Sequence, residues 1–432
     1  MKIAVIGGGS SYTPELIEGI ILRADQFKVD EIVLVDIEAG KEKLEIVGAL
    51  AKRMIQKSGL PIKVELTFNR IKAITNADFV LTQFRVGGLD ARANDERIPL
   101  KYDVIGQETV GPGGFAKAIR TIPVILDICD EIEQYSKDAW LINFTNPAGM
   151  VTEAVHKYTN VKVIGLCNVP VNMKQMAANI LEVDRDDLNI SFSGLNHLVY
   201  ATKVFVGGKD KMNTLIERIA EGRNMNMRNI HDAPWDKEFL QALQALPCPY
   251  HRYYYMMDEM LIEEKEAAEL RGTRAEQVKV IEKALFKTYS NPNLDVKPKE
   301  LEERGGALYS EAAISLITSI VTNDHAIHTV NVPNNGTIPN LPDDVVIEVS
   351  CVVNSEGPQP IQVGTLPSEI NGLIQQVKAF EQLTIEAAVT GDKGKALLAL
   401  TTNPFVPSSK VAKLLLQDLL ETNQDYLPQF HK

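Results

Sequence analysis

Two residues in the middle of the chain, Cys167 and His197, have side chains that often bind transition metals. A thiolate and an imidazole suit a borderline divalent metal, and two protein ligands would leave coordination positions open for substrate oxygens. The structural alternative is that Cys167 is a small buried hydrophobic residue and that His197 is a hydrogen-bonded histidine of the core. The residues alone leave both interpretations open.

A run of four tyrosines in six positions is the second group that could do chemistry, and it consists of Tyr250, Tyr253, Tyr254 and Tyr255. A tyrosine can accept a proton as phenolate when a nearby cation or metal lowers its pKa. Aromatic packing or an interface would explain the same run without catalysis. The sequence does not choose among the four side chains.

A glycine-rich turn near the N-terminus predicts a dinucleotide site. It follows an apolar run and consists of Gly7, Gly8, Gly9, Ser10 and Ser11. Glycines let the backbone approach a pyrophosphate, whose charge the first N–H groups of the next helix would bind. Asp36 closes the next predicted strand, where a carboxylate accepts a hydrogen bond from a ribose 2′-OH and so favours NAD over NADP. The third glycine of G-x-G-x-x-G is absent, because Tyr12 or Thr13 stands there, and a plain strand–helix turn is the alternative.

More polar segments lie where predicted strands end or a predicted helix begins, at residues 84–88 with Arg92, 107–114, 143–147 and 167–170. Turn chemistry explains each of them alone. In open α/β sheets, however, ligands bind beyond the C-terminal ends of the strands. Several such segments at one edge of a sheet therefore favour a ligand site.

The first part of the chain alternates short β-branched runs with longer helical patterns. Strands are expected at residues 3–6, 31–36, 63–67, 79–83, 139–144 and 162–166, and helices at 14–23, 41–57 and 116–135. This alternation is typical of βαβ units and predicts a parallel sheet with helices on both faces. Residues 1–165 are therefore expected to form an N-terminal Rossmann-type, doubly wound, NAD-binding domain.

The pattern changes after residue 165. Helices are expected at 172–181, 212–220, 256–270, 277–290, 311–322 and 367–390, strands at 199–206 and 345–353, and a loop at 331–342. This mixture predicts a C-terminal α+β domain, residues 166–432, packed on the first. The whole is expected to be an α/β protein like lactate and malate dehydrogenases.

The composition excludes several classes of protein. The chain has 432 residues, of which 45% are hydrophobic, and a formal net charge of -12 at pH 7. An acidic excess of this size argues against nucleic acid or an anionic membrane surface as a partner. The cysteines lack the spacing of a disulfide or zinc framework, and neither a membrane-spanning run nor a secretory signal is recognised. A cytoplasmic location is therefore expected.

Together these segments resemble glycoside hydrolase family 4, the NAD- and metal-dependent glycosidases. The resemblance covers nearly the whole chain and includes residues 7–9, 98–102, 107–114, 145–147, 167–170, 196–197, 334–336 and 357–361. It implies that NAD⁺ oxidises the sugar at C3, that a base removes the acidified C2 proton and that the aglycone then leaves from C1. Water addition and return of the hydride would complete the reaction, without the paired carboxylates of ordinary glycosidases.

The resemblance also implies roles for individual residues. Cys167 and His197 correspond to the metal ligands, usually for Mn²⁺, although the ligand types alone leave Co²⁺, Ni²⁺ and Fe²⁺ open. Tyr250 corresponds to the C2 base and Glu108 to a neighbour that increases its basicity. An arginine suits a 6-phosphate, and substrate contacts are implied at Arg92, Asn146 and Arg274. A homodimer or homotetramer is implied as well.

Asn168 indicates the branch of the family. Members that act on α-linked phosphoglucosides resemble Cys-Asp-x-Pro, in which the Asp donates a proton, whereas this chain has Asn168 between Cys167 and Val169. Because Asn cannot donate a carboxylic proton, the segment resembles the 6-phospho-β-glucosidase branch, with Asn168 as a substrate contact. The expected substrate is a phosphorylated β-glucoside such as cellobiose 6-phosphate.

Other functions compete with this hypothesis. A 2-hydroxy-acid dehydrogenase would share the glycine turn, but it would have no task for Cys167, His197 and the tyrosines. A family 4 glycosidase of other sugar specificity and a non-catalytic NAD sensor are further alternatives.

Overall fold

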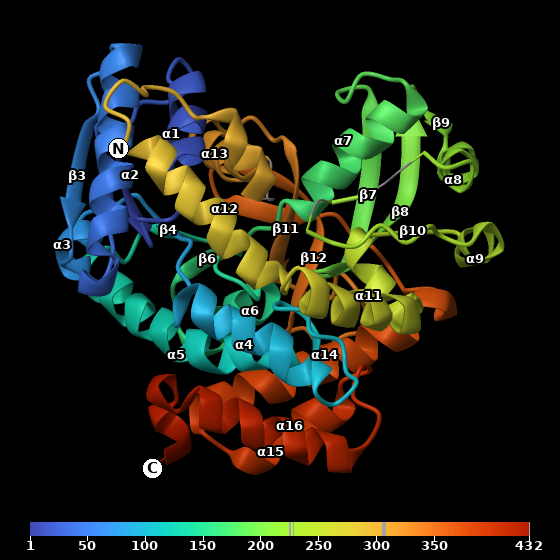
Figure 1. The fold of residues 1–432 in the computed structure, drawn as a ribbon. Coiled ribbons are helices and arrows are strands. Elements are labelled where there is room, and N and C mark those ends of the chain that lie inside the picture. Colours follow the sequence, from blue (N-terminus) through green and yellow to red (C-terminus); the bar gives the residue numbers. More distant parts are fainter. Residues whose placement is uncertain (224–225, 228, 305–307, 432) are drawn as a thin grey trace.

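The computed structural model describes residues 1–223, 226–227, 229–304 and 308–431. A 13-stranded sheet crosses the molecule in the order β10-β8-β7-β12-β11-β6-β5-β4-β1-β2-β3, with β9 beside β8 and β13 beside β12. Figure 1 shows the sheet running from the N-terminal layers to the β7–β8 hairpin. Both predicted parts of the chain therefore contribute to one continuous sheet.

Six parallel strands form the N-terminal half of the sheet in the order β3-β2-β1-β4-β5-β6. This is the strand order of a Rossmann-type fold, which confirms the predicted doubly wound architecture. The strands are β1 (Lys2–Ile6), β2 (Glu31–Val35), β3 (Lys63–Thr67), β4 (Phe79–Thr82), β5 (Trp140–Asn143) and β6 (Lys162–Gly165).

Helices cover both faces of this parallel half because its central strands are apolar on both sides. Ile3 and Val5 of β1 belong to the core under α1 and α2, whereas Ala4 and Ile6 belong to the core under α3, α5 and α6. The helices are α1 (Thr13–Leu22), α2 (Lys41–Ser58), α3 (Arg70–Ile74), α4 (Gly88–Leu100), α5 (Gly111–Tyr135) and α6 (Ala148–Tyr158), with η1 (Glu38–Gly40) before α2.

Antiparallel strands extend the sheet beyond β6. β11 joins the two halves, with Asn331 opposite Gly165, and it pairs with β12 along its whole length. The strands are β7 (Leu188–Leu195), β8 (Leu198–Val206), β9 (Lys209–Asp210), β10 (Leu246–Pro247), β11 (Ile327–Pro333), β12 (Val346–Asn354) and β13 (Gly357–Pro360).

Most of the remaining helices surround the antiparallel half or the lower side of α5, whereas α12 packs on α2 and α4, and α13 packs on α1. α14 packs on α5, α6 and α15, and α16 packs on α15 (Figure 1). They are α7 (Val169–Leu181), α8 (Met212–Ala220), α9 (Lys237–Leu243), η2 (Pro249–His251), α10 (Arg252–Tyr255), α11 (Met257–Leu270), α12 (Arg274–Tyr289), η3 (Lys299–Arg304), α13 (Tyr309–Thr322), α14 (Ser368–Thr390), α15 (Lys393–Thr402), α16 (Ser409–Thr422), η4 (Gln424–Tyr426) and η5 (Pro428–His431).

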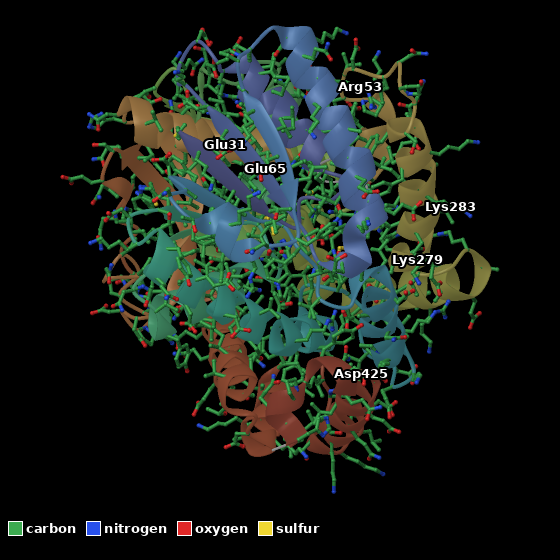
Figure 2. All side chains as sticks on the ribbon, turned by 90° about the vertical axis from the view of Figure 1, so that its left-hand side faces the viewer. Glu31, Arg53, Glu65, Lys279, Lys283 and Asp425 are labelled. Carbon is green, nitrogen blue, oxygen red and sulfur yellow. The ribbon has the colours of Figure 1, made fainter. Side chains whose placement is uncertain are left out.

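α12 connects the side of the molecule that carries the glycine turn, residues 7–11, to its second half. Arg53 on α2, labelled in Figure 2, donates to two carbonyl oxygens. One belongs to Tyr289, the last residue of α12 (2.9 Å), and the other to Leu294, beyond its end (2.6 Å). The Tyr289 hydroxyl in turn donates to the carbonyl oxygen of Ser11 at 2.8 Å. These bonds fix α12 beside the glycine turn.

The outer edge of the sheet is charged, which discourages pairing with another chain. Lys63 of β3 pairs with Glu31 at 2.7 Å and with Glu65 at 2.8 Å, and Figure 2 shows these two glutamates on neighbouring strands.

Some elements differ from the sequence-based expectations. The segment 331–342 was expected to be a loop, but its first residues belong to β11, which ends at Pro333. The expected helix at 256–270 is α11, which begins one residue later, at Met257, because Met256 separates it from α10, which ends at Tyr255. Among the described residues, no helix combines the length and apolar character needed to cross a membrane.

Candidate active site

The glycine turn lies between the ends of β1, β2 and β4. The N–H groups of Gly7 and Gly8 donate to the carbonyl oxygen of Val35 at 3.0 and 2.9 Å. Gly7 has a φ of +82°, and a Cβ there would lie 2.9 Å from the backbone of Phe84. The turn therefore needs glycine, both for its backbone conformation and for its close approach to the next strand.

Asp36 lies against this turn, as expected of an acid at the end of the second strand. Its Oδ2 accepts from the Gly9 N–H at 2.9 Å, and its Oδ1 accepts from the Ile37 N–H at 2.9 Å. A Cβ on Gly9 would meet Asp36 Oδ2 at 2.8 Å. The small cradle, the carboxylate and the N-terminus of α1 beyond the turn fit a dinucleotide.

The two serines of the turn are held by neighbouring groups. Ser10 Oγ accepts from the Tyr12 N–H at 3.3 Å, and Ser11 Oγ donates to Glu282 of α12 at 3.4 Å. α12 therefore closes one side of the turn.

Glu108 is enclosed by three cationic side chains, of which Arg85 forms the shortest contact. Arg92 Nη1 lies 3.0 Å from Oε1 and Lys117 Nζ lies 2.8 Å from Oε2. Burial alone would raise the pKa of Glu108, but Arg85, Arg92 and Lys117 together hold it well below its usual range. Burial, helped by Arg85, lowers the pKa of Lys117 to about 7.

Arg92 is itself buried and forms ion pairs with two acids, Glu96 and Glu108. Its Nε donates to Glu96 Oε1 at 2.8 Å, one turn further along α4. The other oxygen of Glu96 accepts from the Ala275 N–H at 2.7 Å. The ion pair therefore joins α4 to the start of α12.

His197 and Tyr250 stack face to face, with ring centroids 3.9 Å apart and planes inclined by 3°. Burial, followed by the charge of Lys117, lowers the pKa of His197 to about 3, so that the imidazole is neutral at physiological pH. Its Nδ1 is buried and, among the described residues, has no hydrogen-bond partner. A neutral imidazole with an unpartnered nitrogen is what a metal ligand requires.

The Tyr250 hydroxyl accepts a hydrogen bond from Asn229 Nδ2 at 3.2 Å. Burial is the main cause of a raised pKa for Tyr250, and the charges of Cys167 and Glu108 add to it. A phenolate at this position therefore needs a positive charge beside it.

Cys167 lies just after β6 and is 7% exposed. Burial raises the pKa of its thiol, and Glu348 acts in the same direction. Its Sγ accepts from the Val169 N–H at 3.5 Å. His197 stacks on Tyr250, and Cys167 is close enough to raise the pKa of Tyr250, so the thiol and the free nitrogen of His197 are a donor pair whose chemistry fits a divalent transition metal. Among the described residues, no group of three or more His, Cys, Asp and Glu side chains is arranged to hold a metal.

An open cavity of about 180 Å³ lies next to Glu108, between α4, α11 and the start of α12. Arg92, Glu108 and Arg274 line it, so the structure brings these three predicted residues together. Burial, followed by the charges of Arg92 and Arg304, lowers the pKa of Arg274. Its Nε is buried without a partner among the described residues, which leaves a donor for an anion.

Of the predicted substrate contacts, Asn146 and Asn168 do not line this cavity in the described part of the chain. Cys167, His197 and Tyr250 do not line it either. Asn146 precedes a cis peptide bond to Pro147, and its Oδ1 accepts from the Ala148 N–H at 3.4 Å. Asn168 immediately precedes α7, and its carbonyl oxygen accepts from Asn172 Nδ2 at 2.8 Å.

Several site residues were not singled out from the sequence. Lys117 follows a glycine loop, near the start of α5. Arg85 lies in the polar segment 84–88, which was considered as a whole and not for this residue. Glu264 lies on α11 in the wall of the cavity and accepts from the Gly106 N–H at 2.7 Å. Burial, followed by the charge of Glu96, raises the pKa of Glu264 to about 8.

Comparisons with known proteins match the entire length of the chain. Residues 2–183 match the profile described as "Family 4 glycosyl hydrolase", and residues 192–406 match that of its C-terminal domain. A probable 6-phospho-beta-glucosidase of Bacillus subtilis is 56% identical over 432 residues, which are 100% of this chain and 98% of the relative. A 6-phospho-beta-glucosidase of Escherichia coli is 45% identical, over 100% of this chain and 97% of the relative.

The fold also matches solved structures. The 6-phospho-beta glucosidase of Thermotoga maritima, solved with manganese, NAD⁺ and glucose-6-phosphate, has a TM-score of 0.89 at 38% identity, covering 99% of each chain. A malate dehydrogenase of Plasmodium falciparum has a TM-score of 0.56 at 15% identity, over 90% of this chain and 98% of that one. The second match concerns the fold alone and agrees with the predicted dehydrogenase-like architecture.

Proposed function

The chain belongs to family 4 of the glycosyl hydrolases, and on that premise we propose that it is an NAD- and Mn²⁺-dependent 6-phospho-β-glucosidase. The names of the relatives support the β-linkage and the 6-phosphate. Asn168, in place of a proton-donating Asp, supports the same branch. The observation that carries the proposal is the stack of Tyr250 on His197, beside Cys167 and next to a cavity lined by arginines.

The bound cofactors would supply the redox and Lewis-acid chemistry, NAD⁺ by taking and returning the hydride at C3 and Mn²⁺ by stabilising negative charge on sugar oxygens. Gly7, Gly8, Gly9 and Asp36 would hold the dinucleotide, with Ser10 and Ser11 beside its pyrophosphate. Cys167 Sγ and His197 would hold the metal and leave positions open for the sugar.

Tyr250 is the general base that removes the proton from C2 of the sugar. Its pKa is raised while no cation lies beside it, and a positive charge held by Cys167 and His197 would favour the phenolate. Glu108 remains ionised within its cationic cage, so its negative charge strengthens the base for attack on the C–H bond. Asn229 donates to the hydroxyl oxygen and orients it.

The cavity beside Glu108 receives the phosphorylated part of the substrate. Arg92 and Arg274 line it, and the unpartnered Nε of Arg274 is a free donor for a 6-phosphate oxygen. Asn146 and Asn168 contact the sugar from the ends of β5 and β6. Leaving-group departure does not use a carboxylic acid at position 168, so the aglycone leaves with help from water or from another acid.

The organisation of the chain follows from these roles. Residues 1–165 form the NAD-binding domain, and residues 166–432 supply the metal ligands, the base and the contacts between subunits. The sheet nevertheless runs through both, so the two parts are joined along β6 and β11. We expect a homodimer or homotetramer in the cytoplasm, with a mass two or four times the 47.8 kDa of the chain in light scattering.

A direct test is the hydrolysis of p-nitrophenyl β-glucoside 6-phosphate by the purified chain. Activity should require both NAD⁺ and Mn²⁺, and the unphosphorylated and α-linked analogues should be much poorer substrates. Activity that survives removal of both cofactors would contradict the proposal. Net NADH formation from malate or lactate would instead support the dehydrogenase alternative.

A further inference from the structure

Behind Cys167 lies a buried carboxylate that the reaction described above does not use. Glu348 is on β12 and is 0% exposed. Its Oε1 accepts two hydrogen bonds, from Asn331 Nδ2 at 2.8 Å and from Asn196 Nδ2 at 3.3 Å. Its Oε2 is buried and has no hydrogen-bond partner among the described residues. A buried carboxylate is costly to retain, so this one calls for an explanation beyond packing.

One of the two partners of Glu348, Asn196, directly precedes His197 in the chain. β7 ends at Leu195 and β8 begins at Leu198, so Asn196 and His197 form the two-residue loop of a hairpin. His197 has a φ of +60°, which is uncommon for a residue with a side chain. Asn196 Oδ1 also accepts from the Gly149 N–H at 3.4 Å, so its amide is held at both ends. The loop that directs His197 onto Tyr250 is thus anchored by Glu348.

The other partner, Asn331, is bonded to the segment that carries Cys167. Asn331 Nδ2 also donates to the carbonyl oxygen of Gly165, at 3.4 Å, and Gly165 is the last residue of β6. The two strands approach closely here, since a Cβ on Gly165 would lie 2.8 Å from the Cβ of Asn331. Cys167 follows two residues later. One carboxylate oxygen is therefore linked to the segments that carry both members of the donor pair.

We propose that Glu348 is a positioning residue that holds the Asn196–His197 loop and the end of β6 at the separation a metal ion needs. The inference rests on the proposed function, because it takes Cys167 and His197 as the metal ligands. Outer hydrogen-bond partners of this kind orient ligands and set metal affinity. The role of Glu348 is one of position, so an uncharged acceptor of the same shape should replace it.

The test measures binding of Mn²⁺ to the full-length chain by titration calorimetry, with NAD⁺ present. Glu348→Ala should weaken Mn²⁺ binding by about 10- to 100-fold. Glu348→Gln should bind within about threefold of wild type, because its amide oxygen accepts from the same two asparagines. Glu153→Gln is the matched control: Glu153 is equally buried, but it accepts from Lys378 and from the Val346 N–H, so Mn²⁺ affinity should not change.

Wild-type affinity in Glu348→Ala would overturn the inference. Equal weakening in Glu348→Gln and Glu348→Ala would also overturn it, since the negative charge rather than the position would then matter. If Glu348→Ala does not fold, as judged by circular dichroism and NAD⁺ binding, Asn196→Ala removes one of the two links and leaves Glu348 in place. That variant should also bind Mn²⁺ at least about tenfold more weakly, and wild-type affinity would again overturn the inference.

The same titration separates this inference from the proposed function. Cys167→Ser should lose Mn²⁺ affinity, because the thiolate ligand is gone. If wild type does not bind Mn²⁺, or if Cys167→Ser binds it equally well, the metal site itself is wrong. If only the Glu348 variants behave like wild type, the metal site stands and the positioning role fails.

Discussion

Burial determines the resting state of the two rings at the centre of the site. It lowers the pKa of His197 to about 3 and raises that of Tyr250, so both rings are neutral in the metal-free protein. The neutral form is the one that binds a metal in the case of His197, but it is the inactive form of Tyr250 as a base. Tyr250 therefore needs a cation beside it before it can lose its own proton and act as a base.

Replacing Tyr250 by Phe tests this assignment. Tyr250→Phe keeps the ring stacked on His197 but removes the proton acceptor, so kcat should fall by about 10²- to 10⁴-fold while Mn²⁺ and NAD⁺ affinities change little. Tyr254→Phe is the control from the same run of tyrosines, because its ring packs against Phe405 with centroids 4.7 Å apart. A Tyr250→Phe enzyme with the turnover of wild type would rule out the base.

Glu264 gives a pH-dependent prediction that needs no substrate. Burial and Glu96 raise its pKa to about 8 from the ordinary 4.5, so between these values the folded chain keeps a proton that the unfolded chain has lost. Raising the pH from 5 to 8 therefore favours unfolding, by up to about 1.4 kcal/mol per pH unit. Glu264→Gln cannot titrate and still accepts from the Gly106 N–H.

Urea unfolding of metal-free wild type and Glu264→Gln at several pH values measures this difference. The free energy of unfolding of wild type should fall relative to that of the variant as the pH rises from 5 to 8. A constant difference across that range would show that the carboxyl group is already ionised at pH 5.

Individual site residues could be predicted to different extents. Cys167, His197 and Tyr250 stand out by residue type, and the structure places them together. Lys117 did not stand out, because a single lysine in a helix is normally solvated; only the fold shows that it is buried against Glu108. Glu348 has no sequence signal at all, since its partners come from the loop between β7 and β8 and from β11.

At the scale of elements, the glycine turn makes a specific demand on the backbone. Gly7 and Gly59 both have positive φ, +82° and +72°, so alanine costs about 1–2 kcal/mol at either position. A Cβ at Gly7 would also meet the backbone of Phe84, whereas nothing lies within 4 Å of one at Gly59. Gly7→Ala should therefore be the more destabilising change and should weaken NAD⁺ binding at least tenfold (~1.4 kcal/mol).

Gly59→Ala is the matched control, and its NAD⁺ affinity should equal that of wild type. Thermal unfolding and fluorescence titration with NADH measure the two effects. Equal NAD⁺ affinity in both variants would mean that the turn does not contact the dinucleotide.

The parallel strands were predictable and the polar helices were not. β1, β2, β4, β5 and β6 are short, apolar and mostly buried, so their sequence pattern directly reports their position, and the edge strand β3 follows the same alternation. α4 gave no such signal, because it buries Arg92, Asp95 and Glu96 in ion pairs and contains Pro99. Its polar residues build the cavity, and for that reason they break the amphipathic pattern that would reveal a helix.

The net charge of -12 describes the whole molecule, but cationic side chains gather around Glu108. Arg85, Arg92 and Lys117 converge on Glu108, and Arg274 faces the same cavity. Composition therefore argues against extended polyanions as partners, whereas a small phosphorylated sugar needs only the few arginines that line one cavity of an acidic protein. That distinction appears only once the chain is folded.

The proposed reaction cleaves a β-glucoside 6-phosphate by removing the proton on C2 rather than by direct displacement at C1. Hydrolysis in D₂O with NAD⁺ and Mn²⁺, followed by NMR of the released sugar phosphate, distinguishes the two routes. The phenol of Tyr250 exchanges its proton with solvent, so the product should carry deuterium at C2. Product formed at full rate with C2 unlabelled would contradict the account.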